Sequence, residues 1–462
     1  MHSSHHRGRK FLDQFTLLLL AFTQVWIGNT QAVRAQTPEP NKAVSLSLAD
    51  AVDLALKNNL LSVIANERIA QAKGDKGISL SALLPNLSAT ASQMNLTSNL
   101  AALGLPMDAM LGLSTFVEPF NRFDARFQMV QSVFNLSSIR RYQAGSYGVE
   151  LARERQRLVV QQVTSATAIS YLSTLAAEQA VSAAQSNVQL AETLLSLATN
   201  QRSAGVAAGI DVARAETRLA NQRVQLAQTQ TTLDTARLDL LRIIGGISGQ
   251  SFTISVTLRD QMRLAPEPSR DVGEAVKQAL ADRVEVSIAE QEWRISEMQR
   301  KAATADWLPS VSVFGDYGSS GLKPNEVSLP TRSIGIRLDV PIFNGGRTRS
   351  EMQVASSRRR ESDAQLQDIR AAVEKDVRQS LLNVKTREEQ VRSAELAASL
   401  AARELELAQD RFKNGVADNT EVVTAQTALE NARLMLVSSL AQFNIARLNL
   451  ASALGHVEDF RL

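Results

Sequence analysis

The chain has 462 residues, of which 44% are hydrophobic and only 5% aromatic, and its 50 basic and 47 acidic residues leave a net charge of +3. So small a net charge gives no indication of nucleic-acid binding. The sequence has no cysteine, which excludes disulfides, thiolate metal sites and cysteine nucleophiles, and it has no glycine-rich phosphate loop. The shortage of aromatic residues favours long helices over a compact enzyme. We therefore expect no catalytic site, no metal site and no cofactor.

The N-terminus has the pattern of a secretory signal peptide. A basic start is followed by a mostly apolar stretch over 15–27 and by small residues at Val33 and Ala35. We predict a signal peptide at 1–35, cleaved after Ala35. The alternative is a membrane anchor, for which this stretch is short of the roughly 20 apolar residues needed. No later stretch reaches that length either, so a mature chain that enters a membrane must do so through β-strands.

The remainder of the chain contains an internal repeat. Adding 224 to the numbers of eight residues gives an identical residue each time; the eight are Ala51, Val52, Ala55, Leu56, Ile64, Ala65, Leu84 and Pro85. The offset then falls to 209 at Phe134 and is 210 at Gly205, so the first copy carries about 15 extra residues between Pro85 and Phe134. We predict a first repeat over 36–245, a linker over 246–270 and a second repeat over 271–462.

Each repeat begins with a helix. We expect it to run from near Ser47 to before Pro85 in the first copy, and from about Asp271 to Trp307 in the second. Two strands separated by a loop follow in each copy. Alternating apolar and polar residues place the four strands at about 86–92, 124–134, 310–317 and 333–342.

The strand at 333–342 has the clearest pattern. Its apolar face holds Ile334, Ile336, Leu338, Val340 and Ile342, and its polar face holds Ser333, Gly335, Arg337 and Asp339. The apolar face either packs on the chain's own helices or faces lipid while the polar face lines water. Four strands are too few to close a barrel, and lipid does not tolerate open edges. A sheet in a membrane would therefore need strands from several chains, and three chains would supply twelve.

Two very long helices follow the strand pairs, because no glycine or proline occurs over 149–204 or 347–414. At 1.5 Å per residue the second would extend about 100 Å. The returning helices repeat apolar residues every seven positions, a spacing that specifies coiled-coil packing over many turns. The two series are Val212, Leu219, Leu226, Leu233 and Leu240, and Val422, Leu429, Leu436, Phe443 and Leu450.

Several short motifs accompany this order of elements. They are Leu48-x-x-Ala51-Val52-x-x-Ala55-Leu56-x-x-Asn59, the strand entries Leu84-Pro85 and Leu308-Pro309, the strand exit Pro341-Ile342-Phe343-Asn344-Gly345-Gly346, and the turn Arg411-Phe412-x-x-Gly415-Val416. In this order, and duplicated, they resemble the TolC-type outer-membrane efflux protein family over nearly all of the chain after Ser45. Leu60 departs from the family, which commonly has proline there, and this difference affects a helix start.

The resemblance implies a mainly α fold with a small β part. Each chain would contain a duplicated long-helix coiled-coil repeat and four strands. Three chains would form a homotrimer with a 12-stranded transmembrane β-barrel in outer-membrane lipid and a periplasmic α-helical tube. The implied location is the outer membrane of a Gram-negative-type bacterium, with a large periplasmic portion.

The resemblance also implies a function in export. Such a channel is a passive exit duct for small molecules (drugs, metals or other toxic compounds) or for proteins. Its partners would be a periplasmic adaptor, also called a membrane fusion protein, and an inner-membrane pump, with no nucleic acid. The alternative is a periplasmic coiled-coil structural or adaptor protein, which leaves the two symmetric strand pairs unexplained.

Two groups of residues are candidate sites under this resemblance. The first is the pair of turns at the far end of the long helices, where adaptor hairpins would dock: Gly205, Val206, Ala207, Gly415, Val416 and Ala417. The glycines could instead serve only to end the helices in the left-handed conformation.

The second group is Asp211 and Glu421, six residues past each turn glycine. The family often has acidic residues around its periplasmic entrance, and rings of carboxylates attract cations. A carboxylate in the first turn of a helix also favours the helix dipole, which is the alternative role. The family's second acidic position matches Thr424 here, and Arg214 in the first repeat, so the sequence leaves the charge pattern of the gate open.

Overall fold

The computed structural model describes residues 44–99, 116–205, 208–245, 256–265, 270–414, 416 and 419–462. The predicted signal peptide lies outside them. The described chain is mainly helical with few strands, as the sequence predicts. It divides into a sheet unit, formed by the described residues of 78–139 and 304–348, and a helical unit, formed by the rest. None of the described helices is both long enough and apolar enough to cross a membrane.

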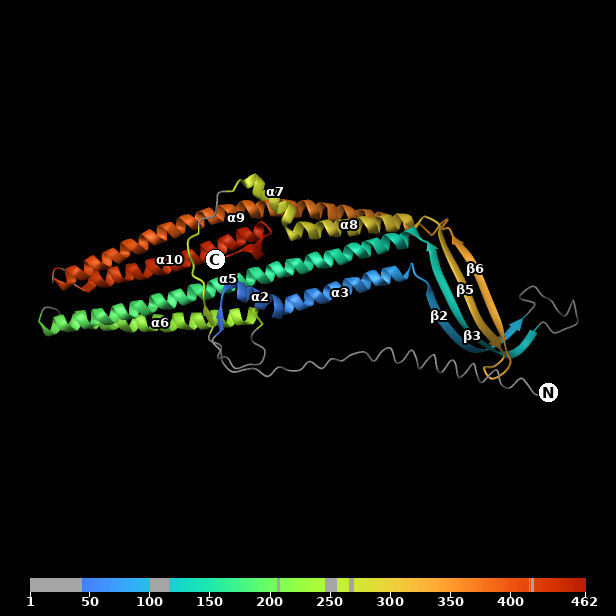
Figure 1. Ribbon diagram of the computed structural model, residues 1–462, viewed down its shortest axis with the longest axis horizontal. Helices are drawn as coiled ribbons and strands as arrows, with labels where there is room; N and C mark the ends of the chain where they lie inside the picture. The colour runs from blue at the N-terminus through green and yellow to red at the C-terminus, as the bar shows by residue number, and fades with distance from the viewer. Residues whose placement is uncertain are drawn as a thin grey trace. The chain divides into compact units, whose positions relative to one another are not determined.

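The sheet unit contains one four-stranded antiparallel sheet with the strand order β2-β3-β5-β6 (Figure 1). The strands are β2 Asn86–Asn99, β3 Phe116–Phe134, β5 Ser310–Gly321 and β6 Ser328–Asp339. The central pair, β3 and β5, joins the two repeats, with Phe127 opposite Tyr317. Strand β6 begins at Ser328, before the expected residue 333, and ends at Asp339, before the expected residue 342. Proline at 341 has no N–H to continue a ladder, which accounts for the early end.

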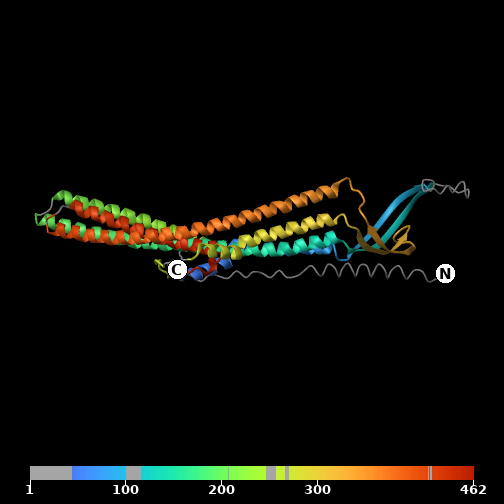
Figure 2. The same cartoon turned by 90° about the horizontal axis from the view of Figure 1, so that it is seen from above.

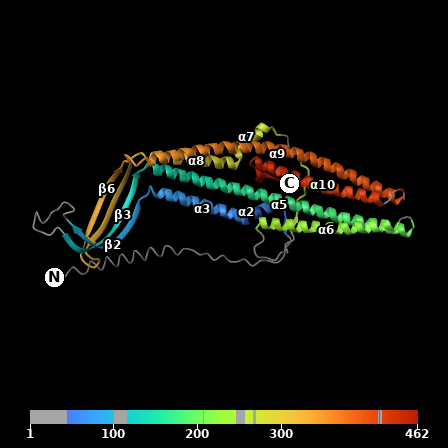
Figure 3. The same ribbon diagram turned by 180° about the vertical axis from the view of Figure 1, so that it is seen from behind.

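The helical unit is built from helices that occur in equivalent pairs. The pairs are α2 Leu48–Asn58 with α7 Val272–Asp282, α3 Leu60–Ser81 with α8 Val284–Ala305, α5 Leu136–Ser203 with α9 Arg347–Lys413, and α6 Gly209–Ile243 with α10 Asn419–Ala453. Helices α5 and α6 form one antiparallel hairpin and α9 and α10 another, as Figure 3 shows from behind. Two short strands, β1 Val44–Leu46 and β4 Val256–Leu258, pair in parallel.

The first helix of each repeat is broken, where the sequence predicts one continuous helix. Asn59 has ψ 131° and ends α2, and Arg283 has ψ 128° and ends α7. The Asn59 side chain accepts a hydrogen bond from the N–H of Leu61 (2.9 Å) and donates one to the carbonyl of Ile243 (3.1 Å). Asparagine side chains compete with helical hydrogen bonding in this way. Helix α3 consequently starts at Leu60, the position where the family commonly has proline.

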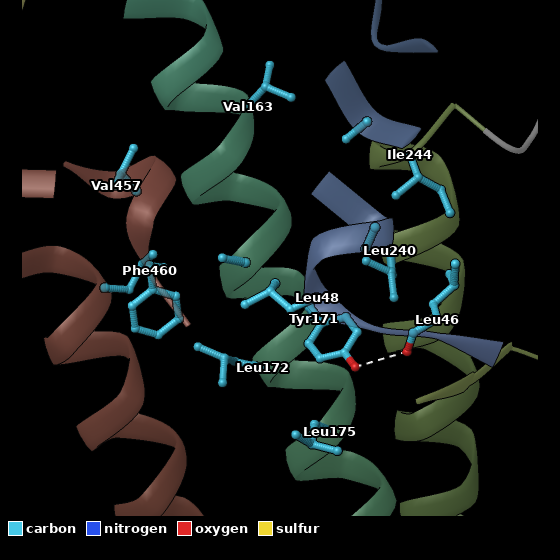
Figure 4. Packing of buried hydrophobic residues seen from close by; sticks show 14 of the residues in the cluster. Leu46, Leu48, Val163, Tyr171, Leu172, Leu175, Leu240, Ile244, Val457 and Phe460 are labelled. Carbon is cyan, nitrogen blue, oxygen red and sulfur yellow. Dashed lines mark hydrogen bonds between the residues drawn. The ribbon is translucent and has the colours of Figure 1, made fainter. Parts of the chain in front are cut away.

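Eight of the ten residues in the predicted seven-residue series are buried along the returning helices, and Leu226 and Leu436 are partly buried. Val422, Phe443 and Leu240 have no exposed surface at all. Figure 4 shows Leu240 in the core with Tyr171, whose hydroxyl lies 3.1 Å from the carbonyl oxygen of Leu46. The same hydroxyl lies 2.8 Å from the Asp260 carboxylate, and burial raises the pKa of Tyr171. In this core, strand β1 therefore packs against α5, α6 and the segment that follows β4.

Candidate functional site

The first candidate site is the helix tip, which we define as 198–205, 208–222, 401–414, 416 and 419–430. Figure 2 shows the ends of α5 and α9 at the same end of the helical unit as the starts of α6 and α10. The Gln201 amide donates to the carbonyl of Phe412 (3.2 Å), and the Asn419 amide donates to the carbonyl of Asp211 (3.0 Å). Phe412 is buried in a cluster contributed by α5, α9 and α10. The two hairpins therefore form one packed tip.

The turn after α5 contains Gly205 with a φ of +76°. Its N–H donates to the carbonyl of Arg202 (3.0 Å), and open space surrounds the position where a Cβ would lie. Glycine is favoured here by its backbone conformation, because only glycine enters the left-handed region without cost. Val206 and Ala207, the other predicted docking residues of this turn, lie outside the described residues.

The turn after α9 is described at Val416, while Gly415 and Ala417 lie outside the described residues. The N–H of Val416 donates to the carbonyl of Arg411 (2.9 Å), and its side chain is 69% exposed. An apolar side chain so exposed at the end of a helical hairpin is available for contact with another molecule.

Asp211 occupies the first turn of α6, and its carboxylate is engaged there. Oδ2 accepts a hydrogen bond from the N–H of Ala208 (3.2 Å), and Oδ1 lies 3.7 Å from the guanidinium of Arg214. Only 15% of the Asp211 side chain is exposed. This geometry corresponds to the helix-start role that the sequence offered as the alternative for this residue.

Glu421 is the more accessible of the two predicted carboxylates. Its side chain is 43% exposed and lies 3.4 Å from the guanidinium of Arg411. It borders a groove of about 450 Å³ lined by Glu404, Leu407, Ala408, Asp410, Arg411, Asn414, Val416, Glu421 and Ala425. Three acidic side chains and two exposed apolar ones, Leu407 and Val416, thus share one groove. Thr424, by contrast, donates its hydroxyl to the carbonyl of Thr420 (2.9 Å).

A buried polar layer between α6 and α10 was not predicted from the sequence. Arg218 forms an ion pair with Glu430 (2.6 Å), which also accepts from the amide of Gln222 (3.0 Å). Gln222 and Gln426 are 2% and 1% exposed, and neither amide atom of Gln426 has a partner in the described part of the chain. The seven-residue apolar pattern gave no signal for these residues, because they lie between its members.

The second candidate site is the sheet, whose two faces differ in character. On one face Ile334, Ile336 and Leu338 of β6 are 87%, 75% and 63% exposed, and Phe127 and Met129 of β3 continue that face. These side chains are exposed within the described part of the chain, whereas a sheet packed on a core would have buried them. An apolar surface of this extent requires a covering partner or solvent other than water.

The opposite face of the sheet carries charged and hydroxyl groups. Arg126 of β3 pairs with Asp124 and, across the sheet, with Asp316 of β5 (3.2 Å). The Ser320 hydroxyl donates to Asp124 (2.9 Å), and the guanidinium of Arg337 lies 5.0 Å from the centre of the Phe314 ring. Polar groups that satisfy one another in this way suit a surface in contact with water.

The family model described as outer membrane efflux protein matches residues 51–246 and 275–456, most of both repeats. The chain belongs to the outer membrane efflux protein family. The predicted family is therefore confirmed, and with it the location in the outer membrane of a Gram-negative-type bacterium. The known members that this efflux protein resembles are channels rather than enzymes.

Related proteins share low identity with this efflux protein over long stretches. The outer membrane protein TolC of Escherichia coli is 21% identical over 357 residues, which cover 73% of this chain and 70% of TolC. The pyoverdine export outer membrane protein OpmQ of Pseudomonas aeruginosa is 25% identical, with 66% of this chain and 62% of OpmQ covered. The alkaline protease secretion protein AprF of the same species is 22% identical, with 84% and 80% covered.

Solved structures of similar fold are outer-membrane channels. The CmeC channel of Campylobacter jejuni superposes with a TM-score of 0.76 at 19% identity, covering 92% of this chain and 91% of CmeC. CusC gives a TM-score of 0.76 at 18% identity, covering 93% and 99%. At such identities the similarity establishes the fold, and the substrates of those channels are their own.

Proposed function

We propose that this efflux protein is the outer-membrane channel of an export system, working as a passive exit duct. The observation that carries the proposal is the open sheet with one exposed apolar face. Strands β2 and β6 each have one neighbour among the described strands, so each leaves one edge unpaired. Lipid tolerates a sheet only when every edge is closed. Pairing β6 of one copy with β2 of the next closes the sheet, and three copies give a barrel of twelve strands.

The length of the apolar face supports insertion in a bilayer. On β3 it extends from Phe123 to Phe134, which is opposite Val311, and these eleven steps cover about 36 Å along a strand at 3.3 Å per residue. At a strand tilt near 40° this covers about 28 Å of bilayer, close to the apolar band of known transmembrane barrels. The polar face, with Arg126, Asp316 and Arg337, then lines a water-filled lumen.

The helix tip is proposed as the docking site for a periplasmic adaptor. We assign this role to Gly205, Val206, Ala207, Gly415, Val416 and Ala417. The groove beside Val416, with its exposed apolar side chains, has the size and character to receive the end of another helical hairpin. The glycines meanwhile end the long helices, so the capping and docking roles are compatible.

The periplasmic gate is proposed to include Asp211 and Glu421, in different roles. In a trimer, three copies of Glu421 present accessible carboxylates at the tip, where they attract cations. Asp211 fixes the start of α6 through Ala208 and Arg214, and so positions the same entrance.

The exported substrate is proposed to be a small molecule, such as a drug, a metal or another toxic compound, or a protein. The names of its relatives include both pyoverdine export and alkaline protease secretion. An inner-membrane pump would supply the substrate through the adaptor. The alternative of a periplasmic coiled-coil adaptor is disfavoured by membership in a family of outer-membrane channels and by the exposed apolar sheet face.

The deciding experiment uses the full-length protein expressed in a Gram-negative host. We expect it in the outer-membrane fraction, as an oligomer that dissociates only on heating, and as a conducting pore in planar bilayers. Recovery as a soluble periplasmic monomer without conductance would exclude the channel and favour the coiled-coil alternative.

A further inference from the structure

Helix α8 lies between two long helices and is paired by charge to both. Glu292 forms an ion pair with Arg155 of α5 (2.6 Å), and Glu290 forms one with Arg370 of α9 (3.1 Å). Figure 1 shows the four neighbouring helices in the order α3, α5, α8, α9. In this row α8 has a long helix on either side, one from each repeat.

Helix α3 is the duplicate of α8 but has a long helix on one side only. The two helices have the same length of 22 residues, and the equivalent alanines, Ala65 and Ala289, are both buried, so the same face points inward. Lys76 of α3 lies over the ring of Tyr142 of α5 (5.3 Å). The face of α3 away from α5 is exposed, including Leu61 at 52%.

Helix α9, at the other end of the row, also has one side that is exposed. On α5, the face toward α8 includes Tyr147 and Arg155, which contact Arg294 and Glu292. Adding the repeat offset of 210 converts residues 147, 151, 155 and 158 of α5 to Ser357, Glu361, Gln365 and Asp368 of α9, and all four are exposed. Val354, one turn earlier, is 51% exposed.

The exposed faces of α3 and α9 carry opposite charges. Compared with the internal pair of Arg155 on α5 and Glu292 on α8, the basic and acidic sides are exchanged. The residue of α3 equivalent to Glu292 is Arg68, by the offset of 224. The position of α9 equivalent to Arg155 is Gln365, which has Glu361 one turn before it and Asp368 one turn after it on the same face. Arg68, Glu361 and Asp368 have no ion-pair partner within the described part of the chain.

We infer that α9 of one copy packs on α3 of the next copy as α5 packs on α8 within the chain, and that Arg68 inserts between Glu361 and Asp368 of the neighbouring copy. This assignment rests on the oligomer of the proposed function and specifies its helical interface. Leu61 and Ile64 lie on the same α3 face as Arg68 and, because the template helices run antiparallel, they would face the part of the neighbour's α9 that follows Asp368. The internal contact between repeats thus serves as the template for the contact between chains, and the reversed charges prevent α3 from taking the place of α8.

The absence of native cysteine permits a direct test by cross-linking. The pair R68C/Q365C, in the otherwise wild-type full-length chain, is expected to give covalent trimers that reducing agent dissociates. The matched control R155C/E292C bridges two helices of one chain, and it is expected to give an internally linked monomer after heating.

The outcomes separate this inference from the channel proposal. If heat-sensitive oligomers form and the control pair links, but R68C/Q365C does not link between copies, the interface is wrong while the channel stands. If the wild-type chain forms no oligomer in the outer membrane, the proposed function itself fails.

Charge reversal provides a second measurement that does not depend on cysteine geometry. R68E is expected to lower the temperature at which the oligomer dissociates, because it places three like charges together at each interface. Adding E361R and D368R to the same chain restores opposite signs and is expected to recover that temperature. Failure of the triple variant to recover any of the loss would overturn the pairing, since both sets of residues are exposed and neither is needed to fold one copy.

Discussion

Gly245 and Asn58 meet so closely that a Cβ added to the glycine would lie 2.5 Å from the Cβ of the asparagine. The second repeat has the same arrangement, because a Cβ added to Gly455 would lie 3.1 Å from the carbonyl oxygen of Asp282. Both glycines have positive φ, 78° and 87°. In each repeat the end of the returning helix therefore rests on the break between the two short helices, and the duplicated sequence produces a duplicated joint.

Alanine at either glycine is expected to destabilise the helical unit. The left-handed backbone and the close approach both oppose a Cβ, and we expect a loss of about 1–3 kcal/mol for each variant in thermal unfolding followed by circular dichroism. The control is G77A, because Gly77 lies inside α3 with open space around it. That variant is expected to be stabilised by up to about 1 kcal/mol. Equal behaviour of the three variants would contradict the strain at the joint.

Glu297 is expected to make stability depend on acid pH. The ion pair with Arg300 (2.8 Å) lowers the pKa of Glu297, and Lys301 adds to the effect. A lowered folded-state pKa contributes stability that is present above the ordinary value of 4.5 and is lost as pH falls through the folded value. E297Q should therefore unfold at lower temperature than the wild type at neutral pH, with the difference shrinking in acid.

The control for this pH dependence is E150Q, which removes an exposed i,i+3 pair with Arg153. Exposed pairs of this kind contribute little, so its unfolding temperature should stay near that of the wild type throughout. A wild-type minus E297Q difference that persists unchanged in acid would show that the carboxylate charge is not what stabilises this contact.

Sequence periodicity predicted most of the fold because it reports which side chains must be buried. The seven-residue series at Val212 and Val422 specified the packed hairpins, and the positive φ of Gly205 agrees with its predicted turn. The break at Arg283 was not predictable, because neither glycine nor proline marks it. It depends on the approach of Gly455, a contact between residues far apart in the chain.

The candidate sites were harder to predict than the fold. Alternation at 334–342 is the same whether the apolar side chains face a core or lipid, and only the exposure of Ile334 distinguishes the two. Asp211 and Glu421 look equivalent by position, yet only one has an accessible carboxylate. The difference arises from neighbours that no local pattern specifies: Ala208 and Arg214 engage Asp211 in a covered position, whereas Glu421 pairs with Arg411 beside an open groove.

A charged side chain at Val416 is expected to abolish export while leaving the oligomer intact. V416R puts a guanidinium on the exposed apolar rim of the tip groove, where an adaptor hairpin would have to desolvate it. We expect sensitivity of the host to an exported toxic compound to rise to that of a channel-free strain, with unchanged heat-sensitive oligomer. V327R is the matched control, because Val327 is a more exposed valine, at 84%, outside the helix tip. Normal export by V416R would remove Val416 from the docking surface.

Removal of the Glu421 carboxylate is expected to weaken block by divalent cations in single-channel recordings. Glu421 is accessible in its groove, so E421A should lower the affinity of a divalent blocker several-fold. D211N should leave the block nearly unchanged, because Asp211 is largely covered and acts on the start of α6. If E421A is blocked like the wild type, Glu421 does not belong to the gate; if D211N loses the block, the roles of the two residues are reversed.

The buried polar layer between α6 and α10 leads to two opposite expectations at neighbouring positions. Gln426 is buried with no partner for its amide among the described residues, so Q426L should stabilise the chain by about 1–2 kcal/mol. E430A should destabilise it by about 1–3 kcal/mol, because it leaves the Arg218 guanidinium without its counter-charge in a half-buried site. Chemical unfolding followed by circular dichroism measures both.

The Q426L variant also tests whether the buried polar layer affects opening of the helix tip. An unsatisfied amide in a buried helix interface is a point where water can enter and the helices can separate, since the contact there is weaker than its surroundings. Q426L should therefore lower the open probability of the channel in bilayers as well as raise its stability. A variant that gains stability with unchanged opening would show that α6 and α10 remain packed at this level when the channel conducts.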